Sequence, residues 1–374
     1  MDTTTPSRVT NVLVVGMTAN IGGIETLMRA IVHSCDPTVV HFDFLSNEPS
    51  IAYEDELTSL GCNSYHVTAR RVSRSNFHRE LRAFFEKHAR DYDVIWENQN
   101  SAANIDYLVY AKRYGIPKRI IHCHNAQNGE GVLRGIMHTI NRPTLASVAT
   151  DFWTVSDESS EWFFGKNYKQ LSGYRVFTNA IDVDTAAYDD DARKRCREEL
   201  GVDEGTAILL NVGRLVPQKN QRVVLSCAAE LMHRGIDAIT LIAGEGPLRR
   251  ELEAQAQELG ISNRVRFLGM VGNVAELYSA ADLFLFPSLF EGLSIALLEA
   301  QANGLPVVTS SAIVRSSIVN ENVICVDVDD RSPVEWANAT ERALKIGRTA
   351  HSAVPGSEFD IKVQAETIQQ LLIS

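Results

Sequence analysis

The sequence predicts an α/β protein built from two parallel-sheet domains. The chain of 374 residues is long for one compact domain, so its length favours two. In each half of the chain, short β-branched runs alternate with longer segments of helical period. This alternation is typical of parallel sheets that helices cover on both faces. A hydrophobic content of 45% is ordinary for a globular protein and allows a substantial core in each domain.

The first half predicts five strands and a helix at 24–35. The helix follows from an apolar stripe at helical spacing, formed by Ile24, Leu27, Met28, Ile31, Val32 and Cys35. The strands are short apolar runs at 12–15, 39–44, 93–96, 118–123 and 151–155. A highly charged segment, 182–205, follows them, and we interpret it as a connector between the halves.

The second half repeats the alternation and ends in a helix. Its strands are predicted at 207–213, 238–244, 264–269, 282–287 and 305–310. Ile361, Ile368, Leu371 and Leu372 predict the last helix, at about 358–373. We expect domains at 1–182 and 183–357, with the segment 358–374 crossing back to the first of them.

Composition excludes several classes of protein. The net charge of −11 argues against nucleic acid as a partner. Six scattered cysteines without a C-x-x-C pair suit free thiols in a reducing cytoplasm, and not a disulfide framework or zinc site. The first ten residues lack the apolar region of a signal peptide, and no apolar run is long enough to cross a bilayer. We therefore expect a cytoplasmic protein, either soluble or peripheral at the inner face of the cell membrane.

Glycines follow the first predicted strand. The strand ends at Gly16, and Gly22 and Gly23 precede the helix at 24–35. In parallel sheets, ligands bind beyond the carboxyl ends of strands, at helix N-termini, where a glycine pair lets backbone N–H groups approach a phosphate or sugar. The alternative is a flexible turn without a ligand. The absence of G-x-G-x-x-G weakens a nicotinamide interpretation.

Two cations follow the first strand of the second half. Arg214 and Lys219 lie in the stretch NVGRLVPQKNQ, directly after that strand. A planar guanidinium and a point-charge ammonium beside a backbone-rich turn suit a diphosphate. The alternative, for such a pair alone, is two solvated surface cations.

Two carboxylates flank an apolar stretch in FEGLSIALLEA, residues 290–300. Glu291 lies in the loop after a strand, and Glu299 lies on the helix that Ser294 begins. Eight helical residues rise on the order of 12 Å, whereas carboxylates that share one glycosidic bond lie roughly 5 to 9.5 Å apart. A loop at Glu291 could shorten this gap, but the pair suits hydroxyl groups at opposite ends of a diphosphate, a transferred sugar and a ribose. The alternative is a solvated helix with its charges outward. The backbone amides that would face the phosphates are those of Gly292, Leu293 and Ser294.

At this point the chain resembles the GT-B glycosyltransferases of the retaining family 4, near the bacterial capsule and exopolysaccharide enzymes. The motifs are GGIE (22–25), IIHCHN (120–125), TNAID (178–182), NVGRLVPQKN (211–220), AGEGPLRREL (243–252), FLG (267–269) and FPSLFEGLSIALLEAQANGLPVV (286–308). The last motif is highly specific, and together they span nearly the whole chain. The resemblance implies two Rossmann-like domains that face a central cleft, an acceptor-binding domain followed by a nucleotide-sugar-binding domain.

The resemblance also implies residue roles. Arg214 and Lys219 bind the donor diphosphate and stabilise the leaving nucleoside diphosphate, with Gly22 and Gly23 among the donor-binding residues. Glu299 accepts hydrogen bonds from the ribose, Glu291 contacts the transferred sugar, and His124 matches the family histidine near the reacting sugar. We count Glu291, His124, Arg214 and Lys219 as catalytic.

A metal site is the alternative for His124. His122 points to the same side if the strand continues, so the two rings could form a metal pair. No third ligand is evident in the sequence, and GT-B enzymes need no metal. A structural histidine is the other alternative. We expect no metal and no cofactor.

Two stretches depart from the family pattern. Asn179–Asp182 reads N-A-I-D where members often have N-G-x-D. The segment 310–322, after the GLP at 304–306, lacks the usual Pro and Glu beside the donor site.

The resemblance implies a transferase that moves a hexose and retains its anomeric configuration. The expected donor is a nucleotide sugar, most simply a UDP-sugar. The expected acceptor is a growing, polyprenyl-linked exo- or capsular saccharide. Two alternatives remain at this stage. One is a nucleotide-sugar epimerase of GT-B fold, and the other is a non-catalytic subunit that only binds nucleotide sugar.

Residues 66–90 suggest a membrane contact. They hold seven Lys or Arg against two Glu, within a first half that is near neutral as a whole, whereas the second half is acidic. Such a segment suits a negatively charged cytoplasmic surface. The alternative is an ordinary amphipathic helix that packs on the sheet with its charges in solvent.

Overall fold

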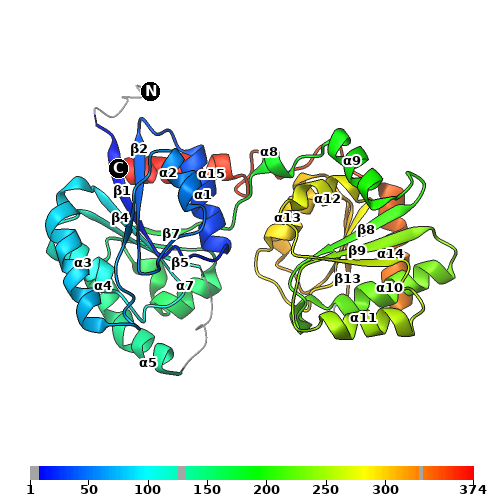
Figure 1. The fold of residues 1–374 in the computed structure, drawn as a ribbon, viewed down its shortest axis with the longest axis horizontal. Coiled ribbons are helices and arrows are strands. Elements are labelled where there is room, and N and C mark those ends of the chain that lie inside the picture. The colour runs from blue at the N-terminus through cyan, green and yellow to red at the C-terminus, as the bar shows by residue number, and fades with distance from the viewer. Residues whose placement is uncertain (1–7, 125–131, 328–331) are drawn as a thin grey trace. The chain divides into compact units, whose positions relative to one another are not determined.

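The computed structural model describes residues 8–124, 132–327 and 332–374, and the chain divides into two units (Figure 1). The first comprises the residues up to Asn179 together with Ile361–Ser374, and the second comprises Ala180–Asp360. Each unit holds one sheet, and within the described ranges every paired strand runs parallel to its neighbour. The prediction of two parallel α/β domains is confirmed.

The first sheet is 7-stranded, in the order β3-β2-β1-β4-β5-β6-β7. In the central strand, Val12 pairs with Phe42 on one side and Val94 on the other. The strand is buried on both faces, which explains its unbroken apolar run. The strands are β1 (Thr10–Val15), β2 (Val40–Ser46), β3 (Ser64–His66), β4 (Val94–Gln99), β5 (Lys118–Cys123), β6 (Asp151–Thr154) and β7 (Tyr174–Val176).

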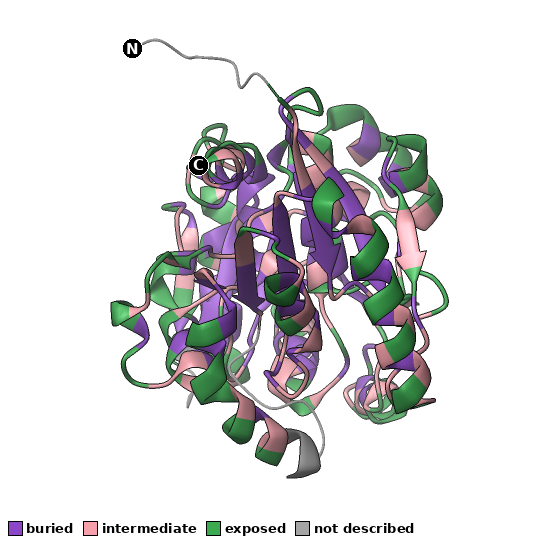
Figure 2. Ribbon diagram, turned by 90° about the vertical axis from the view of Figure 1, so that its left-hand side faces the viewer, coloured by how far each residue is buried: buried purple, intermediate pink, exposed green. Residues whose placement is uncertain are grey.

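Helices cover this sheet, and Figure 2 shows buried strands flanked by helices with exposed outer faces. They are α1 (Gly23–Ser34), α2 (Glu54–Ser59), α3 (Arg74–His88), α4 (Asp106–Arg113), α5 (Val132–Asn141), α6 (Leu145–Val148), α7 (Asp157–Phe164) and α15 (Ile361–Ile373). In the part of the chain that the structure describes, no helix is both long and apolar enough to span a membrane.

Helix α3 forms most of the charged segment 66–90. Ser73 caps it by accepting a hydrogen bond from the amide of Asn76. Phe77, Leu81, Phe84 and Phe85, at helical spacing, are buried in the core of the first unit. The apolar face of α3 therefore packs inside the protein, and only its charged face meets solvent.

The C-terminal helix α15 belongs to the first unit. It packs against α1 and the neighbouring strands, and its buried residues are Ile361, Gln364, Ala365, Ile368 and Leu372. The Gln364 amide donates to the carbonyl of Thr178 at 2.7 Å, and Gln369 accepts from the amide of Asp36 at 2.8 Å. These bonds tie the end of the chain to the first unit (Figure 1).

The second sheet is 6-stranded, in the order β10-β9-β8-β11-β12-β13. Its strands are β8 (Ala207–Val212), β9 (Ala238–Ala243), β10 (Val265–Gly269), β11 (Leu283–Phe286), β12 (Val307–Ser310) and β13 (Val323–Val326). Its helices are α8 (Val183–Ala186), α9 (Asp190–Leu200), α10 (Gln221–His233), α11 (Arg249–Glu258), α12 (Val274–Ala280), α13 (Ile295–Ala302) and α14 (Pro333–Ile346). Helices α10, α11 and α14 share one core with the sheet, and α9, α12 and α13 share the core of the opposite face.

The interpretation of 182–205 as a connector is wrong for α9, which is an integral helix of the second unit. Arg197 is buried, and its guanidinium lies 3.1 Å from one carboxylate oxygen of Asp282. Arg193 lies 2.8 Å from the other oxygen. Two charged side chains of this segment therefore form an ion-pair network with Asp282, directly before β11, and hold α9 against the second sheet.

Candidate functional site

Two loops of the second unit are joined at the carboxyl edge of its sheet. One follows β8 and holds a short 3₁₀ turn, Pro217–Lys219, and the other follows β11. The amide of Leu289 donates to the carbonyl of Gln218 at 2.8 Å, and the Gln218 side chain donates to the carbonyl of Phe290 at 3.0 Å. Asn220 donates to the carbonyl of Pro287 at 3.2 Å. The two loops therefore form one surface.

An ion pair lies on this surface. Nζ of Lys219 is 2.5 Å from Oε1 of Glu291, and the two side chains are only 18% and 11% exposed. The ammonium also lies 5.1 Å from the ring centre of Phe286. Sequence reasoning gave these residues separate ligand contacts and missed their mutual one, because the contact depends on how two distant loops meet. A desolvated pair of this kind holds both groups in place.

Arg214 lies at the start of the β8–α10 loop and is exposed. Within the described residues, no salt-bridge partner is found for its guanidinium. The backbone beside it is held firmly: at Gly244 (φ +139°) an added Cβ would lie 2.1 Å from the carbonyl oxygen of Gly213. The amide of Leu215 also donates to the carbonyl of Glu245 at 2.9 Å. Close packing of the loops after β8 and β9 thus fixes the backbone on either side of Arg214, whose side chain remains available to a ligand.

Glu299 lies on α13, the helix that begins after Ser294 as predicted. The hydroxyl of Tyr278 donates to its Oε2 at 3.1 Å. Burial raises the pKa of Glu299, and the hydrogen bond from Tyr278 opposes that rise. Tyr278 comes from α12, and nothing in the sequence indicated it.

The turn before α13 holds the other predicted donor contacts. Gly292 is exposed and Ser294 is buried, and the Ser294 side chain does not cap the helix. Leu293 lies between them and is half-buried. Glu291 forms an isolated parallel bridge with Ile313. The segment 310–322, which departs from the family pattern, therefore lies directly beside the turn.

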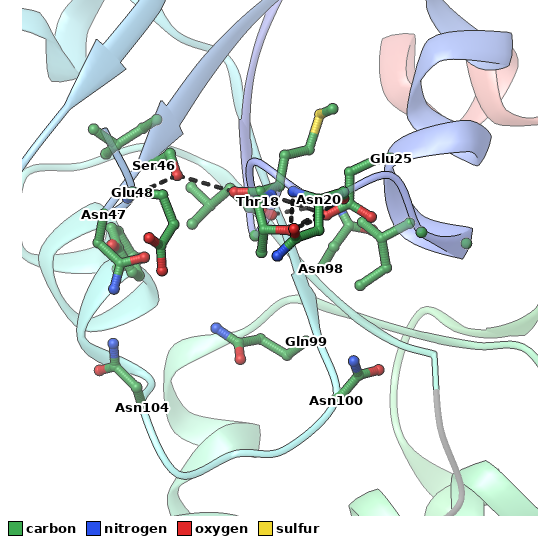
Figure 3. A pocket seen from close by; sticks show the side chains of 18 of the residues that line it. Thr18, Asn20, Glu25, Ser46, Asn47, Glu48, Asn98, Gln99, Asn100 and Asn104 are labelled. Atoms are coloured by element: carbon green, nitrogen blue, oxygen red, sulfur yellow. Dashed lines mark hydrogen bonds between the residues drawn. The ribbon is translucent and has the colours of Figure 1, made fainter. Parts of the chain in front are cut away.

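The first unit has a pocket of about 500 Å³ at the carboxyl ends of β1, β2 and β4 (Figure 3). The predicted glycine pair, Gly22 and Gly23, lines it. Most of its polar lining is amide side chains: those of Asn20, Asn47, Asn98, Gln99, Asn100 and Asn104. Sequence reasoning missed these amides. The run ENQN at 97–100, four polar residues that follow the apolar start of β4, is the signal that would have predicted three of them.

Gly16 at the end of β1 is required by close packing. Its φ is +107°, and an added Cβ would lie 2.0 Å from the carbonyl oxygen of Asn98. Only glycine allows β1 and β4 to approach this closely beneath the pocket.

The His124 ring is attached to this pocket through Asn98. The Nδ2 of Asn98 donates to the carbonyl of Val15, so its Oδ1 accepts from Nε2 of His124, at 2.8 Å. Loss of hydration lowers the pKa of His124 to about 3. His124 is therefore a neutral ring at physiological pH, with Nε2 as its donor.

His122 lies behind His124, with ring centres 4.0 Å apart. It is fully buried, and neither ring nitrogen has a hydrogen-bond partner among the described residues. Burial is the main cause that lowers the pKa of His122, and the charge that His124 can carry lowers it further. Across residues 8–124, 132–327 and 332–374, no three His, Cys, Asp or Glu side chains converge as a metal site would need. Asn125, the last residue of the IIHCHN motif, lies outside the described residues.

A buried acid supports the pocket. Glu97 on β4 is 0% exposed, and its Oε1 accepts from the side-chain Nε2 of Gln99 at 2.7 Å. Its Oε2 has no hydrogen-bond partner within the described part of the chain. Burial raises the pKa of Glu97 to about 8, and the nearby charge of Asp106 contributes to the rise.

The family comparisons agree on one class of protein. A family model described as "Glycosyl transferases group 1" matches residues 192–356. "Putative glycosyltransferase EpsF" of Bacillus subtilis (strain 168) is 30% identical over 360 residues, which cover 94% of this chain and 90% of that protein. The "UDP-Gal:alpha-D-GlcNAc-diphosphoundecaprenol alpha-1,3-galactosyltransferase" of Escherichia coli is 28% identical over 226 residues, 59% of this chain and 58% of that protein.

A solved structure has the same fold. The crystal structure of Anabaena HepE in complex with UDP and glucose matches this chain with a TM-score of 0.74. The match covers 97% of this chain and 99% of that chain at 19% identity. At that identity the likeness concerns the fold, and the predicted GT-B fold is confirmed.

The raised pKa of Glu97 predicts a pH-dependent stability. Because the folded state binds this proton more tightly than the unfolded chain, stability is lost as the pH rises from 4.5 to about 8. Glu97→Gln removes the titration but keeps the shape and the bond from Gln99. We expect the Tm of the variant to match wild type at about pH 5 and to exceed it by at least about 3 °C at about pH 9. An equal Tm difference at both pH values would contradict the assignment.

Proposed function

This chain belongs to the GT-B glycosyltransferases, and we propose that it is a retaining, family 4 enzyme that moves a hexose from a UDP-linked donor to a growing lipid-linked saccharide. HepE, solved with UDP and glucose, supports the donor class. The Escherichia coli enzyme, named for UDP-galactose and a diphosphoundecaprenol acceptor, supports both substrate classes. The observation that carries the proposal is the Lys219–Glu291 ion pair, on the loop surface that also holds Arg214.

In the proposed donor complex, Lys219 and Arg214 hold the diphosphate. Lys219 is already fixed by Glu291, and Arg214 is exposed and uncommitted, so both can contact an incoming anion. The first-turn amides of α13 add partial positive charge on the same edge of the sheet. These groups neutralise the charge that builds on the leaving UDP, so the proposal needs no metal.

The two glutamates are proposed to bind the two ends of the donor. Tyr278 holds Oε2 of Glu299 and leaves Oε1 for the ribose hydroxyls. Glu291, in the turn before α13, contacts the transferred sugar. Equivalent hydroxyl contacts are the usual use of carboxylates in a sugar site, because an ionised carboxylate only accepts hydrogen bonds.

The proposed chemistry requires no protein nucleophile. The acceptor hydroxyl attacks on the face from which UDP departs, and the departing phosphate oxygen takes its proton. The new glycosidic oxygen–carbon bond replaces the bond to phosphate, so the anomeric configuration is retained. His124, neutral and oriented by Asn98, is proposed to hydrogen-bond the reacting sugar, since a ring with a pKa of about 3 is not a general acid at neutral pH.

The assay that separates this proposal from its alternatives uses a panel of UDP-glucose, UDP-galactose and UDP-N-acetylglucosamine. A transferase releases UDP and attaches the sugar to an acceptor. An epimerase changes the sugar without net UDP release, and a binding subunit does neither. Release of UDP with one donor supports the proposal, and recovery of an epimerised donor without transfer would contradict it.

The cation pair yields the first prediction from this site. We expect Lys219→Ala and Arg214→Ala each to lower turnover by about 100-fold or more, the scale of losing one charge donor to the transition state. Arg264→Ala is a matched control, because Arg264 pairs with Asp237 at the amino end of β10. Near-normal UDP release in both site variants would contradict the proposed phosphate contacts.

The glutamates yield a second prediction. Glu299→Gln should weaken UDP affinity about 10-fold or more, because a charge-assisted ribose contact is lost. Glu291→Gln should leave UDP affinity nearly unchanged and lower transfer. Glu258→Gln, an exposed site on α11, should change neither. Calorimetric titration of UDP measures the affinities, and an equal loss in both site variants would mean that the donor ends are misassigned.

A peripheral contact with an anionic membrane is also proposed, through the charged face of α3. Arg70 and Arg71 are engaged by Asp106 and Glu48, at 3.3 and 3.2 Å, so they are less suited to lipid. The available exposed cations of this helix include Arg74, Arg82 and Lys87. Each contributes about 1 kcal/mol near an anionic surface.

Liposome flotation tests the contact. Wild type should float with anionic vesicles at low salt and dissociate in high salt, because the attraction is screened. The triple variant Arg74→Glu, Arg82→Glu, Lys87→Glu should not float. A control triple in the second unit, Arg250→Glu, Arg342→Glu, Lys345→Glu, should behave as wild type. If wild type ignores anionic vesicles at low salt, the contact is wrong, whereas the transferase proposal is unaffected.

A further inference from the structure

We propose that the pocket of the first unit binds one uncharged, hydroxyl-rich sugar residue of the acceptor and discriminates against anionic sugars. This inference rests on the proposed function, since it takes a saccharide as the substrate. The pocket volume of about 500 Å³ is in the range of small-molecule sites, roughly 300 to 1,000 Å³ (Figure 3). The chemistry of its lining sets the ligand class.

Two of the amides are oriented by neighbours that lie behind them. Gln99 donates through Nε2 to the buried Glu97, which leaves its carbonyl oxygen as an acceptor. Asn104 accepts at Oδ1 from the guanidinium of Arg70 at 3.2 Å and from the amide of Asp106 at 3.1 Å, which leaves its NH₂ group as a donor. The pocket therefore presents one fixed acceptor and one fixed donor.

Three further amides are uncommitted. Within the described residues, the side chains of Asn20, Asn47 and Asn100 have no hydrogen-bond partner, and each offers two donors and an acceptor. A sugar hydroxyl both donates and accepts, so it can satisfy either end of an amide. A phosphate or carboxylate only accepts, and would leave the amide carbonyl oxygens without donors.

The charges around the pocket also disfavour an anion. No Lys or Arg is among the residues that line it, whereas Glu25 and Glu48 are. Glu25 is buried in the first turn of α1, where its charge offsets the positive end of the helix. Its Oε1 accepts from both the amide and the hydroxyl of Thr18, at 2.9 Å each. An anionic sugar would therefore meet carboxylates and an already compensated helix end. The two cations beside the lining are already engaged, Arg70 by Asn104 and Asp106 and Arg71 by Glu48.

Gly22 leaves space for the carboxylate of Glu25. A Cβ on Gly22 would lie 2.8 Å from Oε2 of Glu25. Gly22 thus leaves room for this carboxylate at the helix end. The carboxylate would repel a phosphate, whereas it can accept a hydrogen bond from a sugar hydroxyl. The sugar is favoured.

Saturation-transfer NMR on the full chain tests the inference with named probes. Methyl α-glucoside and N-acetylglucosamine are the uncharged ligands, and glucose 6-phosphate and glucuronate are the anionic ones. We expect signal from the uncharged pair at millimolar concentrations and none from the anionic pair. Equal or stronger binding of the anionic sugars, or no binding of any probe, would overturn the proposal.

Variants connect the signal to the pocket. Asn47→Leu and Asn100→Leu keep the approximate shape but lose every hydrogen-bonding group, so each should weaken binding of the uncharged sugars about 3- to 10-fold, as expected for one hydrogen bond. Asn167→Leu, at an exposed site of the same unit outside the pocket, should change nothing. Asn100→Lys should admit glucose 6-phosphate. Unchanged binding in all pocket variants would overturn the assignment.

The donor must be distinguished from the acceptor as the source of the sugar. If UDP-glucose leaves the glucoside signal intact, the pocket holds an acceptor sugar, as proposed. If UDP-glucose displaces the glucoside and Asn100→Leu weakens UDP-glucose but not UDP, the pocket holds the transferred sugar, and the acceptor assignment is overturned. UDP release, measured separately, reports on the transferase proposal, so failure of either proposal can be seen without the other.

Discussion

Parallel strand pairing is the constraint on which both candidate sites depend. Because the paired strands of each sheet run the same way, the loops that follow them gather at one edge, where the next helices begin. In the second unit this places the loop after β8 against the loop after β11, and so brings Lys219 to Glu291. In the first unit it places polar residues after β1, β2 and β4 around one pocket. The chemistry follows from the topology.

Sequence periodicity predicted the central strands well and the edges poorly. The buried runs such as β1, β5 and β8 are continuous apolar segments, which a central parallel strand requires. The missed strands β3, β7 and β13 lie at sheet edges, and each is short and partly exposed. An edge strand buries less surface, so its sequence has no sustained apolar run to detect. The charge of α9 concealed a structural helix for a related reason: its buried guanidinium looks, in sequence, like a solvated one.

The sequence predicted where the site residues lie on the sheet, but it did not predict which side chains they contact. Strand ends and glycines located Arg214, Lys219 and Glu291 on the correct edge, because loop position follows from the order of strands and helices. Partners such as Tyr278 for Glu299, or Glu97 for Gln99, come from packing between separate elements and leave no local pattern. The burial that shifts the pKa of Glu97 and His124 is likewise a property of the folded unit alone.

The central claim is that Lys219, which is paired with Glu291, receives the donor diphosphate. A double-mutant cycle of Lys219→Ala and Glu291→Ala, measured as UDP affinity by calorimetry, tests it most directly. The account predicts that Lys219→Ala lowers the affinity at least about 10-fold and that adding Glu291→Ala restores part of it, because an unpaired carboxylate beside the diphosphate is repulsive. Purely additive effects, or unchanged UDP affinity in Lys219→Ala, would contradict the claim.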